Sequence, residues 1–544
     1  MTADRSFDTV IIGGGHNGLV CASYLAQAGL SVGVFERRAV VGGAAVTEEF
    51  APGFRNSICS YWVSLLHPKV IADLELARFG LKIVPVPGGR LYPSSDGNMY
   101  LSSDLYRKYR ELDRRAAGDS RGYQELSARL EEVAAPMRSL MDRTPPNMSG
   151  GIGDLLKVAA GANDLRRLSE NGRNMLLNLL TRSVGDILND YLQGERIKGA
   201  YGYSAFVGNL QSPFAAGTGF MLLYYSLGGV NGRPGTWGQA IGGMGAITQA
   251  MARSAESRGV FIQTAAAVTE VITKNGIASG IVLADGTVVK AKAVIANVSP
   301  TVLYGKMVDS DLLPREFQRK IKGLRCGSGV VRMNVALAEL PRFASTPGHQ
   351  DDDGYLGSSM LISPSLKYLD EAYEDAKRGG WSQKPVIQMA INSVADPSLA
   401  PDGKHVASIM VQQCSPQLPG NRRWEDHRDD IADLAINTIT EHAPNFKNSV
   451  IARQVLTPKD LENEFGLPNG DIYHGAMHLD QIFSQRPAIG YADYRTPVQN
   501  LFMCGSGAHP GGGVTGIPGR NAAREILRDF RAGKVSRGHR KSYS

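Results

Sequence analysis

Three glycines and one acidic residue near the N-terminus have the spacing of a dinucleotide-binding site. Gly13, Gly15 and Gly18 fit the pattern G-x-G-x-x-G, and Glu36 follows 18 residues after the last of them. In such a site the first glycine permits a tight turn, the second lets the backbone approach a pyrophosphate, and the third lets a helix pack against a strand. The acidic residue accepts hydrogen bonds from the adenosine ribose. A glycine-rich turn without a ligand is the alternative.

The elements around these residues have the order that would position them. An apolar run at 10–12 precedes the glycine turn, a helical pattern spans 19–26, and a second apolar run at 32–35 leads directly to Glu36. This is the order of a Rossmann βαβ unit, strand, turn, helix, strand and acid. The N-terminus of its helix would offer free N–H groups and a positive dipole to phosphates.

A second glycine pair distinguishes between dinucleotides. Arg37 follows the acid, and two glycines and an alanine stand at 42–44. A plain NAD site does not need this pair, whereas the FAD enzymes of the glutathione reductase class pass the same pyrophosphate twice. We therefore predict FAD, with Arg37 near the adenosine or the phosphates. The alternative is that Arg37 and Arg38 are solvated charges at the end of a strand.

Length and composition indicate a globular chain of two or three domains. The chain has 544 residues, of which 43% are hydrophobic and 20% charged. No apolar leader precedes the first strand, and no run approaches the roughly 20 apolar residues of a membrane span. The five cysteines are scattered without a C-x-x-C pair, so neither a redox disulfide nor a disulfide framework is expected. A reducing cytoplasm is the expected location.

The positive charge is concentrated at the C-terminus. The segment 528–544 contributes +5 of the net charge of +7. The rest of the chain is therefore close to neutral, and no nucleic-acid partner is expected. A solvated tail at 533–544 is the plain interpretation, and contact with a partner or an anionic surface is the alternative.

The middle of the chain changes character twice. Short β-like runs fill 76–101, and 104–195 is mostly helical, with an apolar stripe from Met175 to Leu192 that fits a core or lid helix. A membrane-surface role is the alternative for this stripe, so peripheral membrane contact is possible but not required. Residues 201–237 are rich in glycine, aromatic residues and leucine, which suits the wall of an apolar pocket and a packed core equally well.

The nucleotide-binding part is predicted to return after residue 237. Strands are expected at 260–262, 267–273, 280–283 and 288–296, the last ending at Asn297. The glycines of 242–245 precede a helix but follow no apolar strand, so they are not a second dinucleotide site. A strand at 501–504 then enters a glycine loop, and a helix begins near 514–516. Its N-terminus would stabilise negative charge on a reduced flavin.

Few other residues suggest chemistry. Residues 305–450 show mixed α/β patterns, and His349 with the acids 351–353 is expected to be a solvent-exposed loop and not a metal site. His474 and His478 are expected to be structural or substrate-lining. His509 precedes a proline and fixes a turn, or acts as an acid or base near the flavin. No catalytic side chain can be named.

Four blocks of the chain resemble the phytoene desaturase-related FAD oxidoreductases. The blocks are 10–38, 40–54, 241–262 with 294–300, and 504–523. The resemblance implies an α/β fold in which a discontinuous Rossmann-type FAD domain (1–75, 237–304 and 455–532) receives a mixed α/β substrate domain with a helical lid region (76–236 and 305–454). It also implies that Val268 meets the adenine through its backbone. The residues expected to bind FAD are Gly13, Gly15, His16, Asn17, Gly18, Glu36, Arg37, Gly42, Gly43, Ala44, Val268, Asn297, Gly505, Ser506, Gly513, Val514, Thr515 and Gly516.

The expected activity is hydride transfer between an apolar, polyene- or lipid-like small molecule and FAD, with oxygen or a quinone as acceptor. A flavin amine oxidase is the alternative enzyme, although no lysine stands beside the strand that ends at Asn297. The alternative that is not an enzyme is a partner protein that FAD stabilises and that shows little turnover. Substrate, acceptor and oligomeric state cannot be derived from the sequence.

Overall fold

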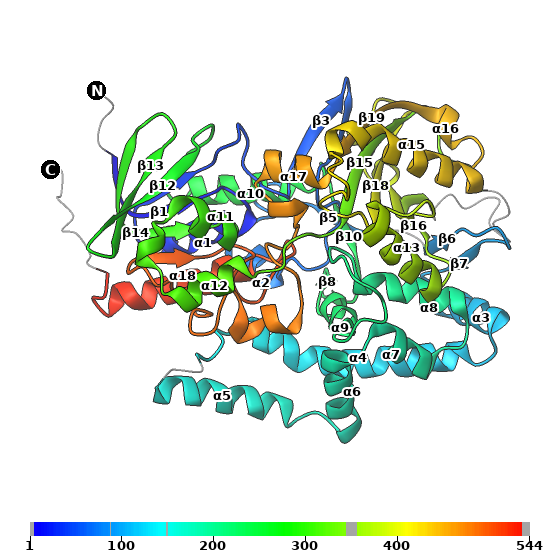
Figure 1. The fold of residues 1–544 in the computed structure, drawn as a ribbon, viewed down its shortest axis with the longest axis horizontal. Coiled ribbons are helices and arrows are strands. Elements are labelled where there is room, and N and C mark those ends of the chain that lie inside the picture. The colour runs from blue at the N-terminus through cyan, green and yellow to red at the C-terminus, as the bar shows by residue number, and fades with distance from the viewer. Residues whose placement is uncertain (1–4, 87–88, 148–150, 344–355, 536–544) are drawn as a thin grey trace.

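Two β-sheets stand side by side, with a layer of helices along the lower side of both (Figure 1). A computed structural model describes residues 5–86, 89–147, 151–343 and 356–535. The predicted loop 349–353 and the tail beyond 535 therefore lie outside the described residues.

The first sheet contains the predicted Rossmann unit. Its strands run in the order β11 (Phe261–Gln263), β2 (Val32–Phe35), β1 (Arg5–Ile12), β14 (Val288–Ala296), β13 (Ile277–Leu283) and β12 (Val268–Lys274), and β20 (Leu501–Met503) pairs with β14. β1 is parallel to β2 and β14, and β14 is parallel to β20. Parallel strands end at the same edge of a sheet, so the glycine turn, Glu36, Asn297 and the loop after Met503 all meet there.

Helices cover this sheet at close range. α1 (His16–Gln27) lies between α10 (Gly245–Glu256) and α18 (Ile517–Arg531). A Cβ placed on Gly519 of α18 would lie 2.1 Å from the carbonyl oxygen of Asn17, so only glycine allows the two helices to meet there. This close approach holds the N-termini of both helices at the same edge of the sheet.

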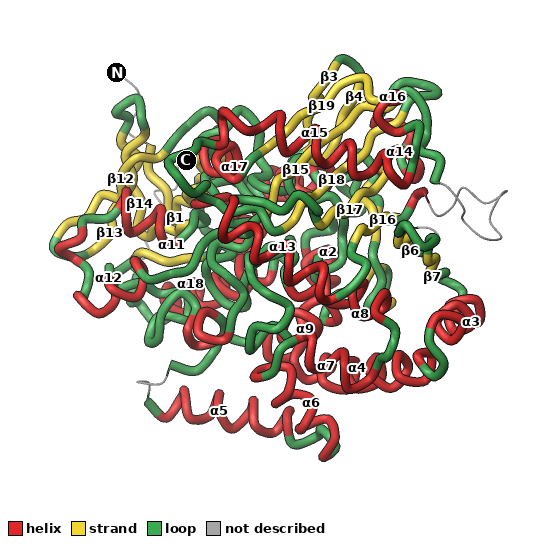
Figure 2. Tube along the Cα trace, turned by 45° about the vertical axis from the view of Figure 1, so that its right-hand side comes forward, coloured by secondary structure: helices red, strands yellow, loops and turns green. Residues whose placement is uncertain are grey.

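The second sheet is almost entirely antiparallel. Its order is β19 (Val450–Leu456), β15 (Val330–Leu337), β18 (His405–Gln412), β17 (Val386–Ile391), β16 (Ser359–Ile362), β6 (Arg90–Tyr92) and β7 (Met99–Leu101), with only β6 and β16 parallel. α15 (Trp424–His442) packs on one face, where Ile409 and Val411 belong to the same core (Figure 2). Because side chains alternate along a strand, Met410 points to the opposite face.

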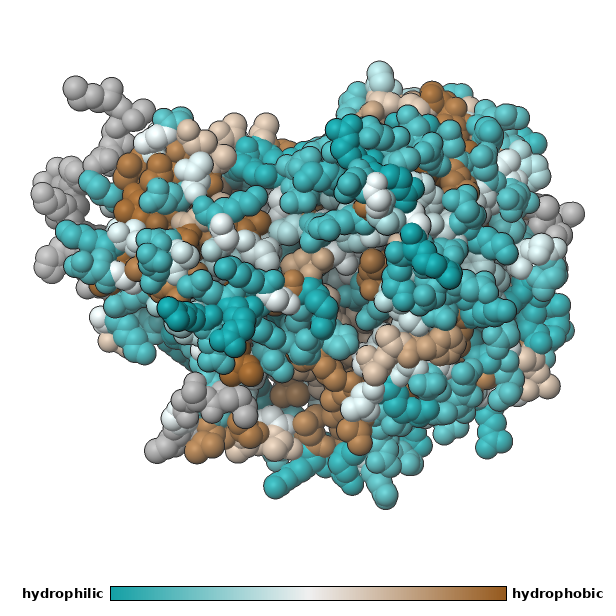
Figure 3. All heavy atoms as spheres, viewed as in Figure 1, coloured by the Kyte–Doolittle hydropathy of each residue, from teal (hydrophilic) through white to brown (hydrophobic). Residues whose placement is uncertain are grey.

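A helical layer contributes a third core. It consists of α3 (Leu105–Arg115), α4 (Asp119–Met141), α5 (Ile152–Leu165), α6 (Glu170–Thr181), α7 (Val184–Tyr191), α8 (Glu195–Gly202) and α9 (Phe220–Ser226). The stripe predicted as one helix belongs to two, because the Ser183 side chain accepts a hydrogen bond from Asp186 N–H and starts α7. Apolar side chains lie exposed over α5 and α6, among them Leu155, Leu156 and Leu177 (Figure 3).

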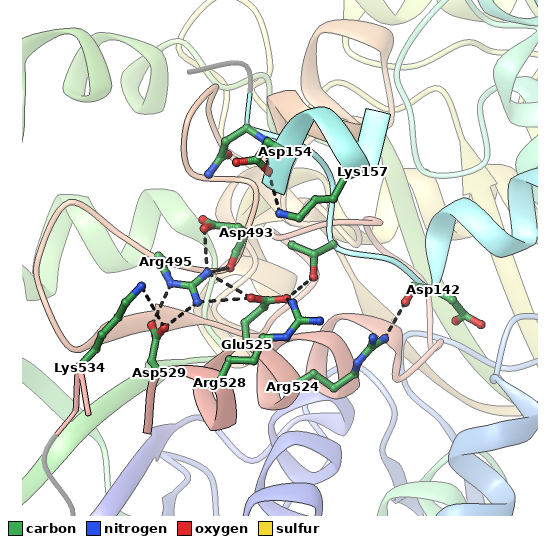
Figure 4. Close-up of polar contacts among 12 residues, drawn as sticks. Asp142, Asp154, Lys157, Asp493, Arg495, Arg524, Glu525, Arg528, Asp529 and Lys534 are labelled. Atoms are coloured by element: carbon green, nitrogen blue, oxygen red, sulfur yellow. Dashed lines mark hydrogen bonds and ion pairs between the residues drawn. The ribbon is translucent and has the colours of Figure 1, made fainter. Parts of the chain in front are cut away.

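An ion-pair cluster fastens α18 to the loops beside it (Figure 4). The guanidinium of Arg495 pairs with Asp493, Glu525 and Asp529 at 2.8 to 3.3 Å. Glu525 also accepts a hydrogen bond of 2.6 Å from the Thr144 hydroxyl, which links α18 to the segment between α4 and α5. These contacts hold the C-terminal helix against the helical layer.

The glycines at 242–245 have a packing role. A strand does precede them, β10 (Gly238–Ala240), contrary to prediction, but it pairs with β5 (Ile83–Pro85) outside the first sheet. Cβ atoms placed on Gly243 and Gly245 would come within 2.4 and 2.6 Å of Thr47. These glycines therefore allow α10 to approach β3 (Thr47–Ala51), and the parallel strand of a second Rossmann unit is missing among the described residues.

Candidate functional site

A cavity of about 640 Å³ lies between the two sheets. The carboxyl edge of the first sheet forms one end, which we call the nucleotide end, and aromatic side chains form the other, which we call the aromatic chamber. Most residues predicted to bind FAD line this cavity: Gly13, Gly15, His16, Asn17, Glu36, Arg37, Gly43, Ala44, Val268, Asn297, Ser506, Gly513 and Val514. Segments from both ends of the chain therefore converge on one space.

The other predicted residues do not line the cavity but shape it: Gly18, Gly42, Gly505, Thr515 and Gly516. A Cβ on Gly18 would lie 2.5 Å from the carbonyl oxygen of Gly13, so Gly18 serves helix packing, as its predicted mechanical role requires. Thr515 accepts a hydrogen bond of 3.0 Å from Ile517 N–H at the start of α18. A contact of these five residues with FAD stays a prediction.

The glycine turn fits a pyrophosphate. Gly43 approaches Gly15 so closely that a Cβ on Gly43 would lie 3.3 Å from the Cα of Gly15. Gly15 starts α1, and no side chain caps this helix, so its first N–H groups remain available to a phosphate. The amide of Asn297 holds the turn from below with a bond of 3.1 Å to the carbonyl oxygen of Gly13.

The carboxylate of Glu36 is held in place by the backbone. One oxygen accepts from Gly14 N–H and the other from Arg38 N–H, both at 2.8 Å. Glu36 is buried and lines the cavity. Each carboxylate oxygen can accept a further hydrogen bond, which is what a ribose would supply.

The two arginines after the acid both lie beside the cavity, and the placement of Arg37 near the adenosine or the phosphates stays a prediction. Arg37 lines the cavity and donates a hydrogen bond of 3.0 Å to the carbonyl oxygen of Asn463, which lies in α17 (Pro458–Phe465). Arg38 forms an ion pair of 2.6 Å with Glu48. Both side chains thus connect the nucleotide end to other parts of the chain.

Five buried polar atoms of the cavity wall lack a partner among the described residues. They are Nε2 of His16, Oδ1 of Asn17, Nη1 of Arg38, Nε1 of Trp62 and Nδ1 of His474. Burial lowers the pKa of His16 to about 4 and that of His474 to about 3, so both rings are neutral at physiological pH. Buried polar atoms of this kind are normally paired, so the wall is suited to a ligand that carries its own donors and acceptors, as FAD does.

The aromatic chamber is built from loops, from helix α9 with the short helical turn at Tyr203, and from the second sheet. Its aromatic lining consists of Tyr61, Trp62, Tyr203, Tyr225, Trp237 and Tyr473. Trp237 stacks on Tyr225 with ring centres 5.8 Å apart and meets Trp62 edge-on at 5.7 Å. The segment 201–237, for which a wall and a core were equally expected, thus supplies part of the wall.

The tyrosine hydroxyl groups of the chamber are neutral and form hydrogen bonds. The hydroxyl groups of Tyr225 and Tyr473 lie 2.6 Å apart, and Tyr61 donates to the side-chain oxygen of Gln388 on β17. Burial raises the pKa of Tyr61 to about 12 and that of Tyr203 well above its usual value. The chamber therefore presents rings and protonated hydroxyl groups.

Several lining residues could not be found from the sequence. Gln388 and Met410 come from neighbouring strands of the second sheet, and the segment 465–468 is the end of α17 and the turn after it. In the sequence these residues lie in ordinary strand or loop patterns, in segments to which no chemical role was assigned. A lysine does line the cavity, Lys306, but its helical segment packs against β12 at the nucleotide end and not at the chamber.

The histidines at 478 and 509 lie outside the cavity wall. His478 pairs with Asp480 at 2.9 Å, and the buried ring of His509 approaches the carbonyl oxygen of Leu140 at 3.3 Å. All five cysteines are described, and none forms a disulfide. In the described part of the chain no cluster of potential metal ligands occurs, and no helix has the length and apolarity to cross a bilayer.

Known proteins place the chain among flavoenzymes. The sequence pattern of the flavin containing amine oxidoreductases matches residues 18–527. The chain belongs to this family. FAD, predicted from the glycine fingerprint, is thus confirmed as the cofactor of this flavin oxidoreductase, and so are the enzyme class and the Rossmann-type α/β fold.

Three relatives match this oxidoreductase over nearly its whole length. Pyridine nucleotide-disulfide oxidoreductase domain-containing protein 2 of Mus musculus is 38% identical, covering 96% of this chain and 94% of its own. A limonene dehydrogenase polypeptide of Castellaniella defragrans is 23% identical over 97% and 96%, and prolycopene isomerase of Daucus carota is 24% identical over 94% and 78%. These relatives confirm the resemblance found in the four sequence blocks.

The same architecture occurs in solved structures. A double variant of putrescine oxidase aligns with a TM-score of 0.62 and 17% identity, covering 97% of this oxidoreductase and 99% of the other chain. At this identity the likeness concerns the fold.

Proposed function

We propose that this oxidoreductase is a desaturase or dehydrogenase that moves hydride from an apolar, polyene- or lipid-like molecule to FAD, with oxygen or a quinone as final acceptor. The single observation that carries this proposal is the aromatic chamber. Six aromatic side chains, together with Met410, Val207 and Ile472, line the end of the cavity opposite Glu36. Apolar pockets with few polar groups suit hydrocarbon substrates. The names of two relatives, limonene dehydrogenase and prolycopene isomerase, point to substrates of the same kind.

The charges in the cavity argue against a cationic amine substrate. Among the described residues the acids of the wall are Glu36 and Glu462, and neither belongs to the chamber segments. Glu36 is already engaged by two backbone N–H groups. An ammonium ion in the chamber would therefore lack a carboxylate to offset its desolvation.

The protein residues would bind the cofactor, exclude water and position the substrate. Bound FAD supplies the hydride acceptor. Gly15, Gly43 and the start of α1 would hold its pyrophosphate, and Glu36 its ribose. In the chamber, the linked hydroxyl groups of Tyr225 and Tyr473 remain protonated and can donate or relay a hydrogen bond.

An anaerobic comparison of substrates tests the proposal. Holoprotein would be mixed, without oxygen, with lipophilic alkenes, aldehydes and amines of matched length, and the flavin absorbance followed. We expect bleaching by an alkene-type substrate, and recovery of the absorbance on adding oxygen or a quinone. Bleaching by the amines alone would make the protein an amine oxidase. No bleaching across all classes would favour a flavin-stabilised partner protein.

A further inference from the structure

Arg90 brings a cation without a carboxylate partner to the aromatic chamber. It lies on β6 and lines the cavity, with the guanidinium carbon 5.5 Å from the ring centre of Trp237. In the described part of the chain no ion pair joins it to an aspartate or glutamate, and its side chain hydrogen-bonds with the neutral phenol of Tyr92. The acids of the cavity wall, Glu36 and Glu462, belong to other segments of the site.

A second arginine adds to the positive charge behind the same wall. Arg332 is 1% exposed, and its guanidinium lies 4.5 Å from the ring centre of Tyr61. It donates to the carbonyl oxygens of Ile409 and Ile58, and its remaining nitrogen, Nη2, is buried without a partner among the described residues. Burial lowers the pKa of Arg332. The groups that raise it again are the phenols of Tyr61 and Tyr203 and the thiol of Cys59, and no carboxylate is among them.

The buried charge of Arg332 is costly unless an anion joins it, and the half-buried Arg90 brings a second cation to the same chamber. A buried cation without a counter-charge loses hydration that neutral carbonyl groups replace only in part. An anion that enters the chamber recovers this loss, whereas an ammonium ion increases it. The electrostatics of the chamber therefore select for a negative group, and its rings select for a hydrocarbon.

We propose that the substrate is an apolar molecule that ends in a carboxylate, and that Arg90 binds this carboxylate while the hydrocarbon lies against Tyr61, Trp62 and Tyr225. The inference deepens the proposed function and rests on it for the hydrocarbon part. The planar guanidinium can bind a carboxylate through two parallel N–H groups, and Trp237 supports it from one side. A phosphate head would use the same charges, and the test separates the two.

The test compares ligands that differ only in the head group. Holoprotein would be titrated with farnesoic acid, farnesol, farnesylamine and farnesyl phosphate, and the dissociation constants obtained from the perturbed flavin absorbance. We expect the acid to bind at least tenfold more tightly than the alcohol, and the amine to bind least. Equal binding of acid and alcohol, or tightest binding of the amine, would overturn the proposal. Binding of the phosphate tenfold tighter than the acid would overturn the carboxylate assignment.

Two variants assign the preference to Arg90. Arg90→Gln should bring the affinity for the acid to that for the alcohol while the affinity for the alcohol stays within twofold. Arg90→Lys should keep an intermediate preference, since it retains the charge but loses the planar fork. Each variant is checked for its flavin spectrum. A preference that stays unchanged in Arg90→Lys and Arg90→Gln, or in whichever of them retains flavin, contradicts the proposal.

A matched control is available on the surface. Arg422 also lies over a tryptophan, with its guanidinium carbon 5.3 Å from the ring centre of Trp381, but it is exposed and away from the cavity. Arg422→Gln should leave the ratio of acid to alcohol affinity unchanged, and a similar loss there would show that Arg90→Gln acts through general charge.

The two proposals can fail separately. Preferential binding of the acid without bleaching by any substrate defeats only the redox proposal, and bleaching by an alkene without acid preference defeats only this one.

Discussion

Single residues at the nucleotide end perform two tasks at once. Glu36 accepts hydrogen bonds from two backbone N–H groups, which fix the glycine turn, and still has lone pairs facing the cavity. Asn297 likewise binds the carbonyl oxygen of Gly13 and lines the cavity. A substitution at either position therefore changes both the shape of the site and its contacts with the cofactor.

Glu36→Ala should weaken FAD binding. The carboxylate can offer one or two charged hydrogen bonds to the ribose, each worth about 1.5–3 kcal/mol. We expect the dissociation constant for FAD to rise roughly tenfold or more, measured by titrating apoprotein with FAD. Glu49→Ala is the matched control, because that exposed carboxylate also accepts from a backbone N–H group, that of Gly53, on a surface hairpin. An unchanged constant for Glu36→Ala would mean that the acid does not contact the ribose.

Gly15→Ala should reduce FAD retention, for one of two reasons that a double variant separates. The added Cβ would lie 2.9 Å from Nδ2 of Asn297, and it would also occupy the approach of the pyrophosphate. Combining it with Asn297→Ala removes the first conflict. We expect the purified double variant to hold less flavin than Asn297→Ala alone, whereas equal flavin content would assign the effect to the asparagine. Gly379→Ala, with open space around its Cβ, serves as control.

Among the elements, α18 is paired with a charge supplied by a neighbouring loop. Arg495 stands between the carboxylates of Glu525 and Asp529, whose side chains are 5% and 8% exposed (Figure 4). These carboxylates raise the pKa of Arg495, and in return its charge compensates their burial. α18, which begins at Ile517 beside the cavity, is thus paired towards its far end with Arg495 in addition to Arg528 and Lys534.

Arg495→Ala should destabilise the protein by roughly 2 kcal/mol, because two largely buried carboxylates lose a shared guanidinium and keep only the more exposed Arg528 and Lys534 as cationic partners. The measurement is the thermal unfolding midpoint of the holoprotein, followed together with flavin release. Arg423→Ala removes an exposed pair with Asp426 three residues away and should shift the unfolding midpoint far less. Equal shifts in the two variants would contradict the role given to Arg495.

At the scale of the whole molecule, three buried histidines make the protein sensitive to acid. Burial holds the pKa of His16 and His509 at about 4 and that of His474 at about 3. The unfolded chain, in which a histidine titrates near 6.5, therefore binds protons first as the pH falls. Stability is complete above about pH 7 and is lost from pH 6.5 towards pH 4.

His509→Gln should remove one third of this sensitivity without changing the cavity wall. Each such histidine contributes roughly 2 kcal/mol of destabilisation at pH 5 relative to pH 7. The urea midpoint of His509→Gln should therefore fall less between these pH values than that of the unchanged protein. His427→Gln, at a surface histidine paired with Asp430, provides the comparison. Parallel pH profiles for all three proteins would refute the assignment.

The arrangement of the two sheets predicts that NADH and NADPH do not reduce the flavin directly. Within the described residues only one parallel βαβ unit carries a glycine fingerprint, and the glycines at 243 and 245 pack against Thr47. Oxidised holoprotein mixed with excess NADPH, and separately with NADH, without oxygen should keep its flavin absorbance. Bleaching as fast as turnover would make the protein a reductase.

The sequence by itself determined the nucleotide end. Gly13, Gly15, Gly18 and Glu36 lie on one continuous unit, where local geometry demands glycine and a fixed spacing brings the acid to the same edge. A ligand that needs a tight turn and a close backbone approach leaves this mark in any chain that binds it. The resemblance of distant blocks extended the prediction to Asn297 and the loop before α18.

Only the tertiary structure decided the aromatic chamber. Arg90, Trp237 and Gln388 come from segments about 150 residues apart and meet because β6 joins a sheet built mostly from the chain after residue 330. Aromatic residues, an arginine and a glutamine carry no spacing rule, since each is equally at home in a packed core or on a surface. Long-range strand pairing, which local sequence does not encode, turns them into one wall that includes Arg90 and has the buried Arg332 behind it.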